Sequence, residues 1–136
     1  MRIEQVNISE ETKKMIMDGF AQHAIEKTGY DGGILPLSFA AYEGEKMAGI
    51  IDCKFFWGAL HIRWLLVFPP YRNQGIGSAL LLKALSYAKE QGCPFAFVET
   101  MNFQAVNFYQ KMGFVIELSR PGYARNTVFH YLKKDL

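Results

Sequence analysis

Residues 67–80 have the sequence Val67-Phe68-Pro69-Pro70-Tyr71-Arg72-Asn73-Gln74-Gly75-Ile76-Gly77-Ser78-Ala79-Leu80. The apolar run that leads into this segment predicts a buried strand, which Pro69 and Pro70 must end. A helical pattern follows the loop. Gly75 and Gly77 let a ligand approach the backbone closely, and the first amides of a helix have no partner within it. With the positive end of the helix dipole, these amides predict an anion-binding site.

The glycine spacing does not fit two common nucleotide-binding loops. A Walker A loop would end in Gly-Lys-Ser/Thr, and the chain contains no such triplet. A dinucleotide fingerprint would need a third glycine where Leu80 stands. It would also need an acidic residue about twenty positions further on, where only Glu99 is available. What remains is Arg72-x-x-Gly75-x-Gly77 after an apolar strand.

This pattern resembles motif A of the GNAT N-acetyltransferase superfamily, whose loop binds the pyrophosphate of acetyl-CoA. The segment from Asn102 to Phe114 resembles motif B of the same superfamily, and the two motifs occur in the family's order. Motif B also predicts a helix from the residues themselves. Asn102 is a good N-cap, several apolar side chains fall on one helical face, and Gly113 can end the helix in a left-handed conformation.

Composition fits one α/β domain over residues 1–136, since half the residues are hydrophobic and the chain can bury a single core. The polar N-terminus and the lack of a long apolar run predict a soluble, cytoplasmic protein without membrane contact. The net charge of +2 is too small to indicate nucleic acid binding. Cys53 and Cys93 have neither metal-ligand spacing nor the density of a disulfide scaffold, so we expect reduced thiols and no metal.

The order of elements predicts the GNAT fold, a central mixed twisted sheet of about seven strands flanked by about three to four helices. Residues 1–36 would form an N-terminal strand and helix on the acceptor side, residues 60–92 the motif A unit, and residues 94–114 the motif B unit. We expect strands at 2–7, 37–42, 47–56, 60–68, 94–100, 114–118 and 127–133, and helices from a Ser9 cap to about 27, over 75–91 and in motif B.

The resemblance implies transfer of an acetyl group from acetyl-CoA to an amine of a small molecule or peptide, by direct attack in a ternary complex. It places the backbone of the motif A strand at the thioester and pantetheine, and the loop amides and Arg72 at the pyrophosphate. Asn102 and Tyr109 would lie near the thiol. The implied cofactor-binding residues are Leu65, Leu66, Val67, Arg72, Gln74, Gly75, Ile76, Gly77, Ser78, Asn102 and Tyr109.

Tyr109 is the candidate general acid, since a tyrosine is protonated at neutral pH and can donate to a thiolate. Its alternative role is that of a core aromatic residue. The identity of the general base is left open, because the motif A strand lacks the glutamate that family members often carry there. His61 is one candidate, and strand alternation would place it on one face with Arg63, Leu65 and Val67. Glu99 and a bound water are the others.

Arg63 could bind an acidic group on the acceptor, or pair with Asp52 or Glu99. The missing strand acid also leaves open a CoA-binding regulatory or catalytically degenerate protein of the GNAT fold. A nucleotide-binding module without acetyltransferase chemistry is a further alternative. The chain could form a homodimer through the final hairpin or the edge at residues 55–57.

Overall fold

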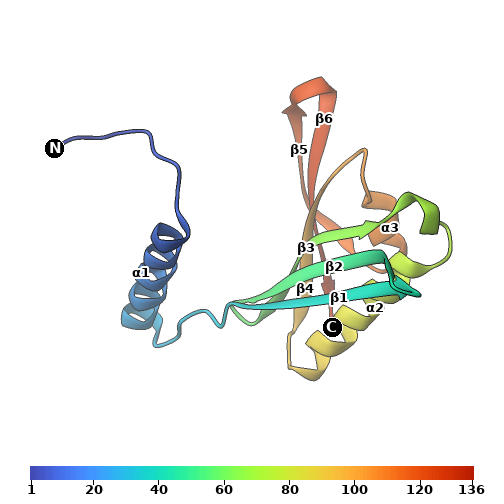
Figure 1. The fold of residues 1–136 in the computed structure, drawn as a ribbon, viewed down its shortest axis with the longest axis horizontal. Coiled ribbons are helices and arrows are strands. Elements are labelled where there is room, and N and C mark those ends of the chain that lie inside the picture. The colour runs from blue at the N-terminus through green and yellow to red at the C-terminus, as the bar shows by residue number, and fades with distance from the viewer. The chain divides into compact units, whose positions relative to one another are not determined.

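The computed structural model describes all residues, 1–136, and divides into two compact units, Met1–Gly33 and Ile34–Leu136 (Figure 1). The first unit contains one helix, and the second contains the sheet and two further helices. The single-domain organisation expected for residues 1–136 stays a prediction.

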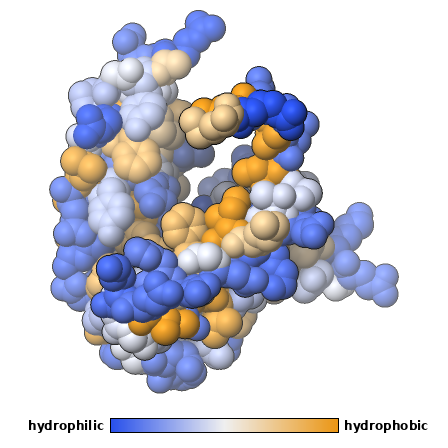
Figure 2. Space-filling model, turned by 90° about the vertical axis from the view of Figure 1, so that its left-hand side faces the viewer, coloured by the Kyte–Doolittle hydropathy of each residue, from blue (hydrophilic) through white to orange (hydrophobic).

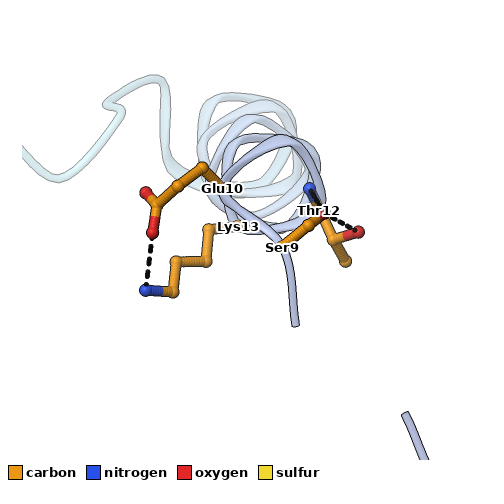
Figure 3. Close-up of polar contacts among 4 residues, drawn as sticks. All are labelled: Ser9, Glu10, Thr12 and Lys13. Carbon is orange, nitrogen blue, oxygen red and sulfur yellow. Dashed lines mark hydrogen bonds and ion pairs between the residues drawn. The ribbon is translucent and has the colours of Figure 1, made fainter. Parts of the chain in front are cut away.

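Helix α1, Glu10–Thr28, begins where its N-terminal residues predict. The Ser9 hydroxyl accepts a hydrogen bond from the Thr12 amide at 3.1 Å, and Glu10 pairs with Lys13 at 3.1 Å (Figure 3). The cap satisfies one of the amides that a helix start leaves unpaired. Gly29 ends the helix at a φ of 78° and donates its amide to the Ile25 carbonyl. The predicted Ser9 cap is therefore confirmed.

The strand expected at residues 2–7 is wrong, because this segment forms no strand. Ile3 and Val6 are the apolar residues of this segment, and they are 83% and 68% exposed. An extended segment becomes a strand only when a neighbouring strand accepts its backbone hydrogen bonds, and none pairs with these residues. The sheet accordingly has six strands, and three α-helices complete the chain.

The second unit is a mixed sheet with strand order β1-β2-β3-β4-β6-β5. Its β3–β4 pair is parallel and all other neighbours are antiparallel, which confirms the mixed sheet. Short 3₁₀ turns follow β3 and β5, at Pro69–Tyr71 and Ala124–Asn126. The strands are β1 (Leu35–Glu43), β2 (Lys46–Phe56), β3 (Ala59–Val67), β4 (Phe95–Met101), β5 (Val115–Tyr123) and β6 (Thr127–Asp135).

Helices α2 (Ile76–Glu90) and α3 (Val106–Lys111) share the core with one set of strand side chains. We call the sheet face that carries these side chains, including Ile51, Ile62 and Val98, the helix face. Gly49 lets α2 come close, because a Cβ there would lie 3.2 Å from Ile76 Cγ2 and 3.3 Å from Leu80 Cδ1. Strand side chains that alternate with the core residues lie on the opposite face.

No helix of the chain is long and apolar enough to cross a membrane. Hydrophobic residues, in orange, are interspersed with hydrophilic ones, in blue, over the surface that Figure 2 displays.

Candidate active site

The loop between β3 and α2 has the backbone geometry of an anion site. Asn73 and Gly75 have positive φ angles of 62° and 80°, which turn the chain into the helix. The first hydrogen bond of α2 runs from the Ala79 amide to the Gly75 carbonyl, at 3.0 Å. The five preceding amides, of residues 74–78, therefore have no acceptor in the protein. They are the donors that the sequence assigned to a pyrophosphate, and they lie at the positive end of the α2 dipole.

Arg72 connects this loop to the strand before it. Its Nε donates to the Val67 carbonyl at 3.0 Å, which leaves the two terminal nitrogens of the guanidinium without a protein partner. A guanidinium presents five N–H donors, so the bond to Val67 uses one and leaves the fork that suits phosphate. The side chain is thereby fixed beside the free amides.

Strands β3 and β4 separate next to this loop. They pair at only three positions, His61 with Phe97 and one residue on either side. Beyond Ile62 and Val98 both strands continue, but they no longer pair with each other. The gap leaves backbone groups of β3 without a strand partner on that side, so an extended ligand with amide groups can bind there. The sheet is therefore splayed at this point.

A bulge in β3 changes which side chains share a face. Trp64 pairs with Asp52 while Ile62 pairs with Cys53, so Arg63 is an extra residue. Such an insertion shifts the alternation by one position. Leu65, opposite Ile51, consequently packs on the helix-face core. The expectation that His61, Arg63, Leu65 and Val67 share one face is therefore wrong.

Tyr109 lies on α3, on the helix face of the sheet. Its side chain is 4% exposed and packs edge-on against Phe108 and Phe114. No protein group bonds to its hydroxyl, and since no fully buried side-chain nitrogen or oxygen lacks a partner, the oxygen reaches the surface. Burial raises the pKa of Tyr109 above its ordinary value of 10.0, and the nearby Cys53 raises it further. The hydroxyl therefore stays protonated at neutral pH and can act as a donor.

His61 and Glu99, expected as competing bases, form a pair. His61 Nε2 lies 2.8 Å from Glu99 Oε2, and the imidazole stacks on the Phe97 ring at 4.5 Å with 5° between the planes. Both residues alternate with the core residues Ile62 and Val98, so they lie on the opposite face of the sheet from Tyr109. Nδ1 of His61 has no partner in the protein.

Arg63 is partnered within the sheet. Its Nε lies 3.7 Å from an Asp52 carboxylate oxygen, and its guanidinium lies over the Trp64 ring, 4.3 Å from the centroid. Asp52 also accepts a hydrogen bond from the Ser38 hydroxyl at 2.6 Å. The expected pairing of Arg63 with Asp52 is present, which weakens the case for an acidic group on the acceptor.

Motif B is anchored differently from its sequence prediction. Asn102 is not the N-cap of α3, because the helix begins four residues later, at Val106. Its Oδ1 instead accepts from the Val128 amide and its own amide donates to the Val128 carbonyl, both at 2.9 Å. Two bonds to β6 thus hold the turn, and only the Asn102 side-chain nitrogen is free for a ligand.

The end of α3 was predicted in part. Gly113 has the expected positive φ, of 94°, which confirms the left-handed helix end. No sequence pattern indicated Lys134, which donates to the Met112 carbonyl at 2.9 Å. A Cβ on Gly113 would lie 2.5 Å from the Lys134 Nζ, the end of a flexible side chain, so the positive φ is the stronger reason for glycine here. Only the fold brings β6 beside the helix end.

The loop, the splayed strands and the two motifs agree with the comparisons to known proteins. The family model described as Acetyltransferase (GNAT) family matches residues 10–114. The chain belongs to this family. The acetyltransferase is 36% identical over 100 residues to blasticidin-S acetyltransferase of Streptomyces morookaense, a match that covers 73% of this chain and 74% of that protein.

Solved structures support the same assignment. A putative acetyltransferase from Agrobacterium tumefaciens has the same fold, with a TM-score of 0.87, 24% identity and complete coverage of both chains. A putative streptothricin acetyltransferase from Bacillus anthracis, solved with acetyl coenzyme A, is 29% identical with a TM-score of 0.68. That match covers 74% of this acetyltransferase and 62% of the other chain. The protein is an acetyl-CoA-dependent N-acetyltransferase, and acetyl-CoA is its co-substrate.

Proposed function

We propose that the enzyme transfers the acetyl group to a primary amine of a small molecule or peptide, by direct attack in a ternary complex. The observation that carries this proposal is that proton-handling groups lie on both faces of the sheet that contains the β3–β4 gap. The His61–Glu99 pair belongs to one face of the sheet and Tyr109 to the other. An amine that arrives on the first face can attack while the thiol leaves toward the second.

The acetyl donor, acetyl-CoA, would bind to the loop and to the motif A strand. The amides of Gln74, Gly75, Ile76, Gly77 and Ser78 would bind the pyrophosphate, together with the free guanidinium nitrogens of Arg72. Each charge-assisted bond is worth about 1.5–3 kcal/mol. The backbone of Leu65, which points toward the gap, would hold the pantetheine and the thioester carbonyl, whereas the backbone groups of Leu66 point to its register partner Ile50 on β2. Val67 would contribute less through its oxygen, which already accepts from Arg72.

His61 and Glu99 would act together as the base. An alkylammonium has a pKa of about 10.4, so only about one amine in a thousand is nucleophilic at neutral pH. A base beside the acceptor restores the missing lone pair. If Nε2–H of His61 donates to Glu99, Nδ1 carries the lone pair that takes the amine proton. In this arrangement Glu99 orients the imidazole and stabilises its charged form.

Tyr109 would donate to the sulfur as the carbon–sulfur bond breaks. Its hydroxyl is protonated, free of protein partners and at the surface of an otherwise buried side chain. A donor held in this way needs no reorganisation when charge develops on the thiolate. The Asn102 side-chain nitrogen, which bonds to nothing in the protein, could add a second donor near the thiol.

A small-molecule acceptor is favoured by the similarity to enzymes named for blasticidin S and streptothricin. The test is a panel of amines that includes blasticidin S, streptothricin and short peptides, with thiol release from acetyl-CoA as the readout. We expect release with at least one class of amine. Binding of acetyl-CoA without release from any amine would favour the degenerate protein instead. Self-association, measured by light scattering, tests the homodimer, which stays a prediction.

The base is tested separately. We expect His61→Ala and Glu99→Gln each to lower kcat and to change the shape of the pH–rate profile. If both variants leave that profile unmoved, neither residue is the base, and the water alternative takes its place.

A further inference from the structure

We infer that Phe97 is a positioning residue that holds the His61 imidazole in the orientation required for proton transfer. This inference rests on the proposed base role of His61. It concerns a residue that does not touch the reacting atoms and that no sequence motif indicated.

The geometry gives the imidazole two restraints in different directions. The bond from Nε2 to Glu99 fixes one ring atom at 2.8 Å, but a single hydrogen bond lets a ring swing about it. The Phe97 ring, 4.5 Å away and only 5° from parallel, fixes the plane of the imidazole. Together they leave Nδ1 in one place, and a catalytic group held in one place loses less entropy in the transition state.

Phe97 is itself fixed, so it can serve as a platform. Its side chain is buried and contacts three further rings, those of Phe56, Phe95 and Tyr131, at centroid distances of 6.3, 6.1 and 5.7 Å. These rings come from β2, β4 and β6. A ring held on several sides transmits its orientation to the imidazole stacked on it.

Several charged or titratable groups share this part of the sheet with the imidazole. Lys54 on β2 pairs in register with His61, and Arg63 follows on β3. Glu99 lies on β4, and Tyr131 and Lys133 on β6 are the register partners of Glu99 and Phe97. Of these groups only Glu99 bonds to the imidazole. Replacement of Phe97 by an apolar residue therefore changes the orientation of the ring without removing a charge.

The test is a double-mutant cycle with kcat and the KM for acetyl-CoA as readouts. Phe97→Leu removes the stacked ring and Phe97→Tyr keeps it. Phe39→Leu is the control, because Phe39 packs against Tyr87 and the helix-face core and takes no part in holding Phe97. We expect Phe97→Leu to lower kcat about tenfold with an unchanged KM, since a small misplacement of a catalytic group costs up to about a hundredfold. Phe97→Tyr should restore turnover to within about twofold, and Phe39→Leu should stay within about twofold of wild type.

In the His61→Ala background, Phe97→Leu should change kcat less than about twofold, because there is no imidazole left to position. An equal loss in both backgrounds would overturn the inference, as would wild-type turnover in Phe97→Leu. A full-activity His61→Ala enzyme would instead refute the proposed base, and the Phe97 role with it. Proton NMR of the free enzyme provides a check independent of turnover. The ring protons of His61 should lie upfield in wild type and lose that shift in Phe97→Leu; the absence of an upfield shift in wild type would refute the stacking itself.

Discussion

The substitution Tyr109→Phe separates the catalytic role of Tyr109 from its role in the core. It removes one oxygen atom and keeps the ring that packs against Phe108 and Phe114. Because no protein group bonds to that oxygen, no partner is left unsatisfied. The free energy of unfolding should therefore change by less than about 1 kcal/mol. Truncation to alanine would instead remove the ring and cost about 3–5 kcal/mol.

The effect on turnover should be far larger than the effect on stability. General acid catalysis contributes about 10²–10⁴-fold, so we expect kcat to fall by about that factor, equivalent to about 3–5 kcal/mol in the barrier. The assay is thiol release at saturating acetyl-CoA, alongside urea unfolding of the same preparations. Tyr87→Phe on α2 is a matched control, since that ring also packs edge-on against a phenylalanine, Phe39. It should leave both quantities unchanged.

Two results would refute this reasoning. Wild-type turnover in Tyr109→Phe would show that the hydroxyl has no part in the reaction. A parallel loss of stability and turnover would show that the hydroxyl supports the fold. Either result would return Tyr109 to the role of a core aromatic residue.

The remaining predictions concern the loop and the buried thiol. Gly75→Ala should cost about 1–2 kcal/mol of stability, because Gly75 has a φ of 80°, and should raise the KM for acetyl-CoA; Gly92→Ala, at a φ of 87°, should cost as much but leave that KM unchanged. Arg72→Ala should raise the Kd for acetyl-CoA about tenfold or more in equilibrium titrations, and an unchanged Kd would contradict the pyrophosphate role. Burial, and to a lesser extent Asp52, raises the pKa of the Cys53 thiol from 9.0 to about 12. The unfolded chain thus loses this proton first, so stability present below pH 9 should fall as pH rises toward 12, by about 1.4 kcal/mol per pH unit. In urea unfolding at pH 8 and 10.5, Cys53→Ala should show a loss smaller by about 2 kcal/mol, and equal losses would refute the burial effect.

Local sequence signals predicted most elements and the anion loop. The Ser9 cap, the two prolines after β3 and the left-handed Gly113 each act within a few residues of the element they bound, so their effect can be predicted without the tertiary structure. The strand prediction at residues 2–7 was wrong for the opposite reason. A strand depends on a partner elsewhere in the chain, and alternation does not supply one.

The candidate site was predicted residue by residue, but its pairwise geometry was not. His61 and Glu99 were both identified, yet they lie 38 positions apart and meet only because β3 and β4 run parallel and in register. The bulge at Arg63 depends on the register with β2, which the sequence of β3 does not encode alone. Asn102 fits a helix cap and a bridge to β6 equally well by residue type, and the fold decides between them.

The three register pairs between β3 and β4 also define a seam in the sheet. They are the only strand pairing that joins β1, β2 and β3 to β4, β6 and β5, so the two halves of the sheet are held together mainly by side-chain packing there. A co-substrate that lies along the exposed backbone of β3 would extend the hydrogen bonding between the two halves, as an additional strand would. Binding would then couple the two halves mechanically, and saturation at a hundred times Kd adds about 2.7 kcal/mol to the free energy of unfolding. The amides that face the seam, including that of Leu65, should be the ones whose hydrogen exchange slows most when acetyl-CoA binds.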